Sequence, residues 1–212
     1  MIWFTNLFVK VTGWIVQLFC FRKKVHYENR HRQNRYIKGP AIIISNHTSV
    51  FDYALMIFVF WTRTLRYQMA ECLFKNKIQK VFLKLLGGIF VDRNSFDFSF
   101  VNKSLKILKR GGVVGIFPES RLPHANEKEL LPFAPSASYI AIESGAPIIP
   151  VYTNGSYFRK ERAHVIIGER IYPRNYWDNN LDEKTNLSNI TEIIRNKVLE
   201  LKDELENRTK KQ

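Results

Sequence analysis

The chain has 212 residues, of which 45% are hydrophobic, and carries a formal net charge of +14. This length suits one domain with a substantial core, and the hydrophobic content excludes general disorder. The charge calls for a negatively charged partner, such as nucleic acid, an anionic membrane or an acidic protein or ligand. Nucleic acid is discounted because the sequence has no helix-turn-helix, zinc-finger or aromatic RNA-binding motif.

Residues 1–21 form the most apolar stretch of the chain and are rich in aromatic residues. The stretch is long enough for a transmembrane helix, but Lys10 at mid-span makes crossing a bilayer costly. Lys10 and Gln17 are seven residues apart and therefore share one helical face. This favours a helix in the membrane interface, or half of a re-entrant hairpin. The alternative is a helix packed on the core of its own domain.

A basic cluster follows this stretch directly. It consists of Arg22, Lys23, Lys24, Arg30, Arg32, Arg35 and Lys38, opposed only by Glu28. A basic cluster beside an apolar helix is typical of a peripheral or monotopic protein on an anionic cytoplasmic leaflet, although a solvated linker is the simpler alternative. We therefore assign residues 1–38 to a membrane-associating segment at the cytoplasmic face of the cell membrane, and residues 39–212 to a single domain.

Strand-like and helix-like runs then alternate along the chain. Strands are predicted at 41–45, 65–70, 88–91, 113–117, 148–152 and 163–168, and helices at 50–61, 75–86, 96–109 and 133–144. Apolar residues at helical spacing predict a final amphipathic helix through Leu187, Ile190, Ile194, Val198, Leu201 and Leu205. The alternation predicts an α/β fold with a mostly parallel central sheet covered by helices.

The sequence suggests neither a metal centre nor a disulfide. Cys20 and Cys72 lie in apolar or partly apolar runs without the spacing of a zinc site or a redox pair. We expect them to be reduced packing residues, and we assign no metal ligands.

A polar cluster with Asn46, His47, Ser49 and Asp52 follows the first predicted domain strand. Ligands bind at the carboxyl ends of strands in open α/β sheets. A histidine takes a proton from a hydroxyl when a carboxylate holds one of its tautomers, and His47 and Asp52 can meet across a turn. No Gly-x-Ser-x-Gly nucleophile motif is present, so the pair suits a base that activates the substrate's own hydroxyl. Alternatively, Asp52 caps the next helix and His47 is an ordinary loop histidine.

The pattern Asn46-His47-x-Ser49-x-x-Asp52 resembles the first motif of the glycerolipid acyltransferases, most of all the 1-acylglycerol-3-phosphate acyltransferases. Three further blocks follow in that family's order, namely 87–93, 117–121 and 146–151. Four ordered blocks are much more specific than one His-x4-Asp match.

The resemblance implies transfer of a fatty acyl group from an acyl thioester to the sn-2 hydroxyl of 1-acylglycerol-3-phosphate (lysophosphatidic acid), giving phosphatidic acid in phospholipid biosynthesis. His47 would take the hydroxyl proton, and Asp52 would orient His47 and balance its charge. The donor would be acyl-carrier protein or coenzyme A thioester, and either suits a basic surface. No further cofactor is implied.

The other blocks imply residues that bind the acceptor. Arg93 and Arg121 would hold the phosphate, because a guanidinium matches phosphate bidentately. Asp92 would align Arg93 or contact nearby backbone, and Glu119 would contact the glycerol hydroxyl or orient a neighbouring cation. The rest of the implied binding set is Asn46, Ser49, Ser120 and Pro147, with Pro147 on the acyl side.

Two departures from the family pattern leave the acceptor open. The usual Phe-Pro-Glu-Gly-Thr-Arg is one residue shorter here, with Ser120 in the glycine position, so a positive φ there would be strained. Many relatives also carry a lysine where this chain has Ala70 and Glu71. Other acceptors are glycerol-3-phosphate, another lysophospholipid or an aminolipid. A non-catalytic lipid-binding protein is a further alternative, although it would need neither His47 nor Asp52.

Overall fold

The computed structural model describes residues 1–93, 95, 97–124, 126–127, 129–158 and 160–210. The strands are β1 (Lys24–Tyr27), β2 (Ala41–Ser45), β3 (Leu65–Ala70), β4 (Ile89–Val91), β5 (Val113–Ile116), β6 (Ile148–Thr153) and β7 (His164–Ile167). The α-helices are α1 (Ile2–Cys20), α2 (Asp52–Val59), α3 (Lys77–Leu86), α4 (Ser99–Lys109), α5 (Ser136–Ser144) and α6 (Glu183–Lys210). Two short 3-10 helices are η1 (Glu71–Phe74) and η2 (Pro173–Tyr176).

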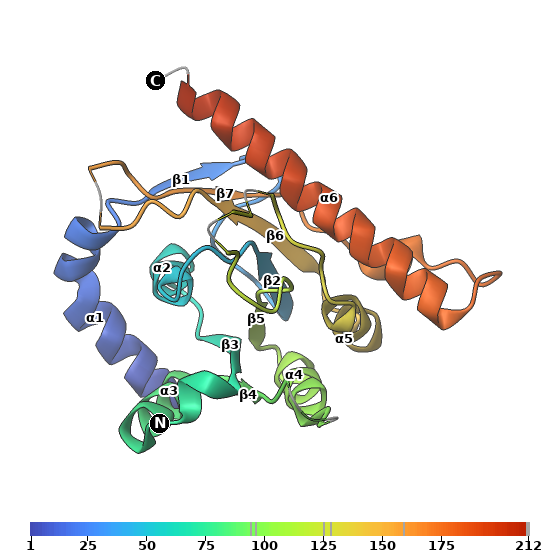
Figure 1. The fold of residues 1–212 in the computed structure, drawn as a ribbon, viewed down its shortest axis with the longest axis horizontal. Helices are drawn as coiled ribbons and strands as arrows, with labels where there is room; N and C mark the ends of the chain where they lie inside the picture. The colour runs from blue at the N-terminus through green and yellow to red at the C-terminus, as the bar shows by residue number, and fades with distance from the viewer. Residues whose placement is uncertain (94, 96, 125, 128, 159, 211–212) are drawn as a thin grey trace.

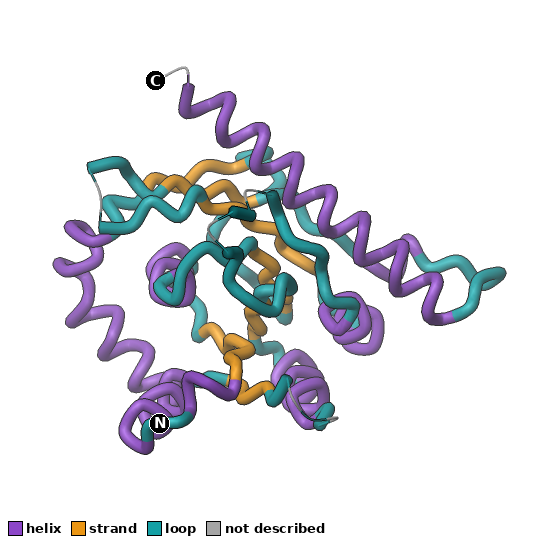
Figure 2. The backbone as a smooth tube through the Cα atoms, viewed as in Figure 1, coloured by secondary structure: helices purple, strands orange, loops and turns teal. Residues whose placement is uncertain are grey.

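The strands form one sheet in the order β1-β7-β6-β2-β5-β3-β4 (Figure 1). Neighbouring strands are parallel except for β6 and β7, which are antiparallel. Helices lie on both sides of the strands (Figure 2). The predicted α/β fold with a mostly parallel sheet is confirmed.

Alternating side chains of the central strand build the two halves of the core. Ile43 of β2 faces the cluster that contains the apolar residues of α2, whereas Ile42 and Ile44 face the cluster with α4, α5 and α6. All three are fully buried. A strand buried on both faces explains the continuous β-branched run in the sequence.

The predicted elements agree with the structure to within a few residues at their ends, except that the predicted helix 96–109 starts at Ser99 and its first residue lies outside the described part. Strand β1 was not predicted. Lys24–Tyr27 were assigned to the membrane-associating segment, but they pair in parallel with β7 from Lys24↔His164 to Tyr27↔Ile167. Cys20 packs against the core as expected, whereas Cys72 in η1 is exposed and is not a packing residue.

Helix α1 contacts the domain through a polar stripe. Asn6 Nδ2 donates to the Leu86 carbonyl at 2.7 Å, and Lys10 Nζ donates to the carbonyls of Trp61 and Arg63 at 2.8 and 2.7 Å. Gln17 is the third buried residue on this face. The prediction that Lys10 and Gln17 share one face is therefore confirmed.

The rest of the α1 surface is apolar and exposed. Among its most exposed side chains are Trp3, Phe4, Phe8, Val11, Ile15 and Phe19. The helix is long and apolar enough to cross a membrane by length and composition. The alternative from the sequence, a helix packed on the domain core, required these large apolar side chains to be inserted into that core. They are exposed instead.

Candidate active site

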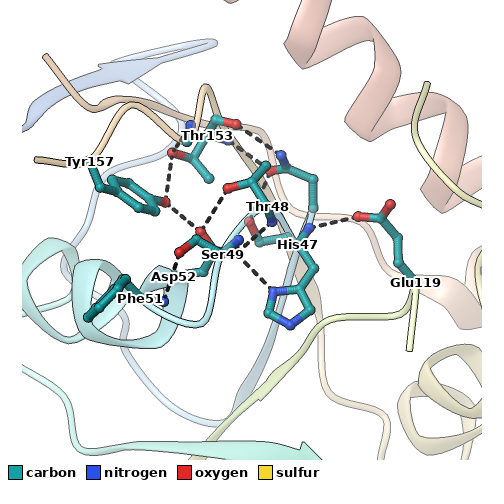
Figure 3. A network of polar contacts seen from close by, with 11 residues as sticks. His47, Thr48, Ser49, Phe51, Asp52, Glu119, Thr153 and Tyr157 are labelled. Atoms are coloured by element: carbon teal, nitrogen blue, oxygen red, sulfur yellow. Dashed lines mark hydrogen bonds and ion pairs between the residues drawn. The ribbon is translucent and has the colours of Figure 1, made fainter. Parts of the chain in front are cut away.

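The polar cluster lies between the end of β2 and the start of α2, at the carboxyl end of the central parallel strand (Figure 3). His47 and Asp52 meet there, with His47 Nδ1 and Asp52 Oδ2 2.8 Å apart. The predicted contact between these two residues is present, at the sheet edge where ligands bind in such folds.

Five donors surround the fully buried carboxylate of Asp52. Oδ2 accepts from His47 Nδ1 and from the backbone N–H groups of Thr48 and Ser49, at 2.8, 2.7 and 2.9 Å. Oδ1 accepts from Thr48 Oγ1 at 3.0 Å and from the Tyr157 hydroxyl at 2.6 Å. These donors compensate the loss of water around a buried charge.

Asp52 is not a helix cap, although its position suggested one. It is the first residue of α2, and the backbone N–H groups that it accepts, those of Thr48 and Ser49, precede the helix. The carboxylate therefore holds the loop that carries His47, rather than the free N–H groups of the helix.

The imidazole of His47 is fixed at one nitrogen and open at the other. Phe117 stacks on the ring with a centroid distance of 4.3 Å and an interplanar angle of 10°. The bond to Asp52 assigns the N–H to Nδ1. Nε2 has no hydrogen-bond partner among the described residues, and the side chain is 21% exposed. Nε2 can therefore accept a proton from a bound hydroxyl.

Glu119 supports the backbone of the same loop. Its Oε1 accepts from the His47 N–H at 2.7 Å and its Oε2 from the Leu131 N–H at 2.9 Å. Burial raises the pKa of Glu119, while these two donors lower it by a smaller amount. The structure thus pairs both carboxylate oxygens with backbone donors, whereas contact of Glu119 with the glycerol hydroxyl or a neighbouring cation stays a prediction.

Asn46 extends the pairing of β2 with β6 beyond their backbones. Its side-chain Nδ2 donates to the Thr153 carbonyl and its Oδ1 accepts from the Thr153 N–H, both at 2.9 Å. The amide is buried and therefore unavailable to a substrate in this arrangement. Asn46 holds the strand ends together, and its predicted place among the binding residues stays a prediction.

Pro147 lies away from the histidine. Its carbonyl accepts from the Ile42 N–H at the beginning of β2, and His47 follows the end of that strand. Because β2 and β6 are parallel, the residue that precedes β6 belongs to the opposite edge of the sheet. Pro147 therefore lies at the opposite edge of the sheet from His47, and the structure does not bring these two residues together.

The two arginines lie near each other through the turn at Ser120. Arg93 Nη1 donates to the Ser120 carbonyl at 2.8 Å, and its Nε and Nη2 donate to Glu71 at 3.1 and 3.0 Å. Arg121 forms a bidentate pair with Glu127, with both bonds at 2.6 Å. Both guanidiniums are exposed and bind carboxylates, which have the fork-matching geometry that a phosphate also offers.

Ser120 has a φ of 62°, in the left-handed region that glycine adopts without strain. A positive φ is the strained conformation that the sequence analysis considered for Ser120, which stands at the family's glycine position. Ser49 supports the loop that carries His47 through its Oγ, which accepts from the Phe51 N–H at 3.2 Å. Asp92 follows β4 and precedes Arg93, in the half-buried position where the chain leaves the sheet.

The sequence did not identify three residues that contact His47 or Asp52, namely Tyr157, Thr48 and Phe117. Tyr157 donates to Asp52 from 105 residues further along the chain, so no local spacing connects them. Thr48 occupies the first unspecified position of the motif Asn46-His47-x-Ser49-x-x-Asp52, so the motif does not predict its two bonds to Asp52. Within the described residues, no group of three or more histidine, cysteine, aspartate or glutamate side chains is arranged to hold a metal ion.

Comparisons with known proteins agree with this geometry. A family model described as acyltransferase matches residues 23–154. The chain is 28% identical over 181 residues to the 1-acyl-sn-glycerol-3-phosphate acyltransferase of Bacillus subtilis (strain 168), covering 83% of this chain and 88% of that protein. It is 27% identical over 155 residues to the human 1-acyl-sn-glycerol-3-phosphate acyltransferase beta, covering 71% of this chain and 54% of that protein.

Among solved structures, the fold is similar to that of the 1-acyl-sn-glycerophosphate (LPA) acyltransferase PlsC from Thermotoga maritima. The TM-score is 0.64 at 21% identity, over 93% of this chain and 78% of that one. This likeness supports the fold.

Proposed function

This chain belongs to the acyltransferase family, and we propose that it transfers a fatty acyl group from an acyl thioester to the sn-2 hydroxyl of 1-acylglycerol-3-phosphate. The observation that carries the proposal is the state of His47, whose Nδ1 is bonded to Asp52 while Nε2 is free of protein partners among the described residues. The names of the relatives from Bacillus subtilis and human support the acceptor.

The reaction needs a base and no protein nucleophile. His47 Nε2 takes the proton of the acceptor hydroxyl as the hydroxyl oxygen attacks the thioester carbonyl. The carbon–sulfur bond then breaks, the thiolate leaves with the proton that His47 returns, and the product is phosphatidic acid. Asp52 stabilises the imidazolium that forms in between, since its carboxylate faces the protonated Nδ1 at 2.8 Å.

Arg93 and Arg121 are proposed to bind the phosphate of the acceptor. Each guanidinium already binds a carboxylate, so the phosphate would exchange with Glu71 and Glu127 at exposed positions where ion pairs are weak. Arg93 donates to the carbonyl of Ser120, which follows Glu119 in the chain. Glu119 in turn accepts from the backbone N–H of His47. This chain of contacts links the phosphate site to the base.

We further propose that α1 lies in the cytoplasmic leaflet with its polar stripe on the domain and its apolar faces in lipid. Replacing Phe4, Phe8 and Ile15 by serine keeps the polar stripe intact and should abolish sedimentation with anionic vesicles. A control that replaces exposed Tyr172 and Leu181 by serine should sediment like wild type. Equal sedimentation of both variants would contradict this placement.

Thiol release from the acyl donor tests the reaction. Wild-type protein should release thiol from acyl-coenzyme A or acyl-carrier protein only when lysophosphatidic acid is present. His47→Ala should lower the rate by about a hundred- to ten-thousand-fold, the usual contribution of a general base. The control His31→Ala, at an exposed histidine, should retain the rate. A folded His47→Ala variant with wild-type activity would refute the mechanism.

A second candidate is the same transfer to another acceptor, and the contact between Glu71 and Arg93 favours it. A carboxylate beside the phosphate-binding arginine suits an acceptor with a smaller negative charge or an amine. A panel of glycerol-3-phosphate, other lysophospholipids and an aminolipid separates the candidates. Faster thiol release with one of these than with lysophosphatidic acid would replace the first acceptor.

A further inference from the structure

A second site lies outside the acyl-transfer centre, in a hollow between α1 and the carboxyl end of α2. Its volume is about 510 Å³. Apolar walls come from Val11 and Trp14 of α1, Phe58 of α2 and Trp61 just beyond it. The rest of the lining is two cationic side chains, Lys23 and Arg35, together with Tyr36 and Thr62. Trp14 and Trp61 meet edge to face with a centroid distance of 5.0 Å, which gives one wall a defined shape.

The hollow is lined by two positively charged side chains, Lys23 and Arg35, and by no acidic residue among those that the structure describes. Neither Lys23 nor Arg35 forms an ion pair within the described ranges. Burial, and then the charge of Arg35, lower the pKa of Lys23 to about 8. Two cations that repel each other in a partly apolar setting favour an anionic ligand, since an anion would stabilise both.

The groups around Lys23 are arranged for an amphiphilic ligand. Lys23 Nζ lies 5.5 Å from the Trp14 ring centroid and 5.9 Å from that of Phe58, and it donates to Gln17 Oε1 at 2.5 Å. Gln17 Nε2 is buried and has no hydrogen-bond partner in the part of the chain that the structure describes. Polar donors and aromatic faces therefore adjoin at the same place.

The position of the hollow separates it from the catalytic residues and relates it to the membrane face. Phe58 lies six residues beyond Asp52 on α2, which is about 9 Å along the helix axis. Val11 and Trp14 are 61% and 47% exposed and belong to the apolar surface of α1. A ligand in the hollow thus lies at the edge of the surface that is proposed to enter lipid.

We propose that this hollow binds the phosphate headgroup of an anionic membrane lipid, with the acyl chains of that lipid lying along the exposed face of α1. The lipid is a ligand of the membrane-bound protein and not the acyl acceptor. Its phosphate binds Lys23 and Arg35, and its glycerol region packs on the aromatic walls. The proposal does not depend on the identity of the acceptor, because the hollow lies at the other end of α2 from Asp52.

Short-chain lipids below their micelle concentration test the site directly. Dihexanoyl phosphatidylglycerol should produce a saturable change in tryptophan fluorescence, because Trp14 and Trp61 line the hollow. Replacing Lys23 and Arg35 by glutamine should weaken this binding about tenfold or more, since both charge-assisted contacts are lost. A control with Lys103 and Lys106 replaced by glutamine, at exposed positions of α4, should bind like wild type.

Three outcomes would overturn the proposal. If the α4 control weakens binding as much as the Lys23 and Arg35 variant, the lipid is held by general charge attraction. If inorganic phosphate binds as tightly as dihexanoyl phosphatidylglycerol, the hollow is a free-anion site. If dihexanoyl phosphatidylcholine binds as tightly, the hollow is an apolar cleft. Arg35→Gln alone serves if the double variant unfolds, since Arg35 makes no ion pair among the described residues. Thiol release in detergent, without added lipid, should be unchanged in these variants, so that loss of acyl transfer is distinguished from loss of lipid binding.

Discussion

Tyr157→Phe tests whether the network around Asp52 contributes to catalysis. The substitution removes one atom, the hydroxyl that donates to Asp52 Oδ1 at 2.6 Å, and keeps the ring that packs edge to face on Phe21 at 5.3 Å. Tyr157 is buried, so water does not readily replace the lost donor. We therefore expect an electrostatic effect on the His47–Asp52 pair with little change in packing.

The size of the effect follows from the donors that remain. A hydrogen bond to a charged group contributes about 1.5–3 kcal/mol, and four other donors still bind the Asp52 carboxylate. We expect the lower half of that range. If the loss falls on the transition state, kcat decreases about tenfold to fortyfold, since 1.4 kcal/mol corresponds to a factor of ten. The KM for the acceptor should be unchanged.

The split between kcat and KM distinguishes this role from a structural one. Without the Tyr157 donor, the Asp52 carboxylate is less firmly held in the position from which it orients His47. kcat should therefore fall while the KM for the acceptor stays the same. The matched control is Tyr53→Phe, which removes a hydroxyl that donates to the Leu86 carbonyl at 3.2 Å and does not touch Asp52.

Thiol release measured over a range of acceptor concentrations gives kcat and KM for both variants. A Tyr157→Phe variant with wild-type kcat would refute the reasoning, provided that its melting temperature is no lower than that of Tyr53→Phe. Equal losses of kcat in the two variants would have the same meaning, because the Tyr53 hydroxyl donates to Leu86 and not to the carboxylate of Asp52.

Three further substitutions have expected outcomes. Glu71→Gln should lower the KM of a phosphate acceptor up to about fivefold, because an exposed ion pair of about 1 kcal/mol no longer competes for Arg93; an unchanged KM would contradict phosphate binding there. Lys10→Met leaves two partly buried backbone carbonyls without their donor and should cost about 1 kcal/mol in urea unfolding, whereas an unaltered midpoint would show that α1 docks by other contacts. Burial, and then the charge of His164, lower the pKa of His26 to about 4, so the unfolded chain binds a proton that the folded one refuses between about pH 6.5 and 4. The melting temperature should therefore fall as the pH is lowered through this window, less steeply in His26→Asn, and identical slopes would contradict it.

The sheet could be predicted where burial leaves a local pattern. Ile42–Ile44 are buried on both faces, so the run of β-branched residues identifies β2 without knowledge of its neighbours. Strand β1 has no such pattern, since Lys24–Tyr27 contains two basic side chains and all four residues are only half-buried. Its strand character depends on β7, which is about 140 residues away in the sequence. Pairing at that distance leaves no periodicity to detect.

The same distinction separates the site residues that were predicted from those that were not. His47 and Asp52 are five residues apart, and one short loop brings them together. Tyr157 reaches Asp52 only because β6 lies next to β2 in the sheet, and the sequence gives no sign of that neighbourhood. Asn46 was assigned to the substrate because of its place in the motif, whereas its amide is used by Thr153 on the same neighbouring strand.

Glu119 shows why a motif predicts that a residue belongs to a site better than it predicts the role of that residue. The carboxylate contacts the backbone of His47, while Asp52 contacts the ring, so the histidine is held from two sides by two acidic residues. One of them orients the reactive ring, and the other fixes the main chain that carries it. Their order in the sequence cannot distinguish these tasks, because the tasks depend on which atoms of His47 each carboxylate reaches. A base held at both its backbone and its Nδ1 loses little freedom when the acceptor binds, and this suits proton transfer at Nε2.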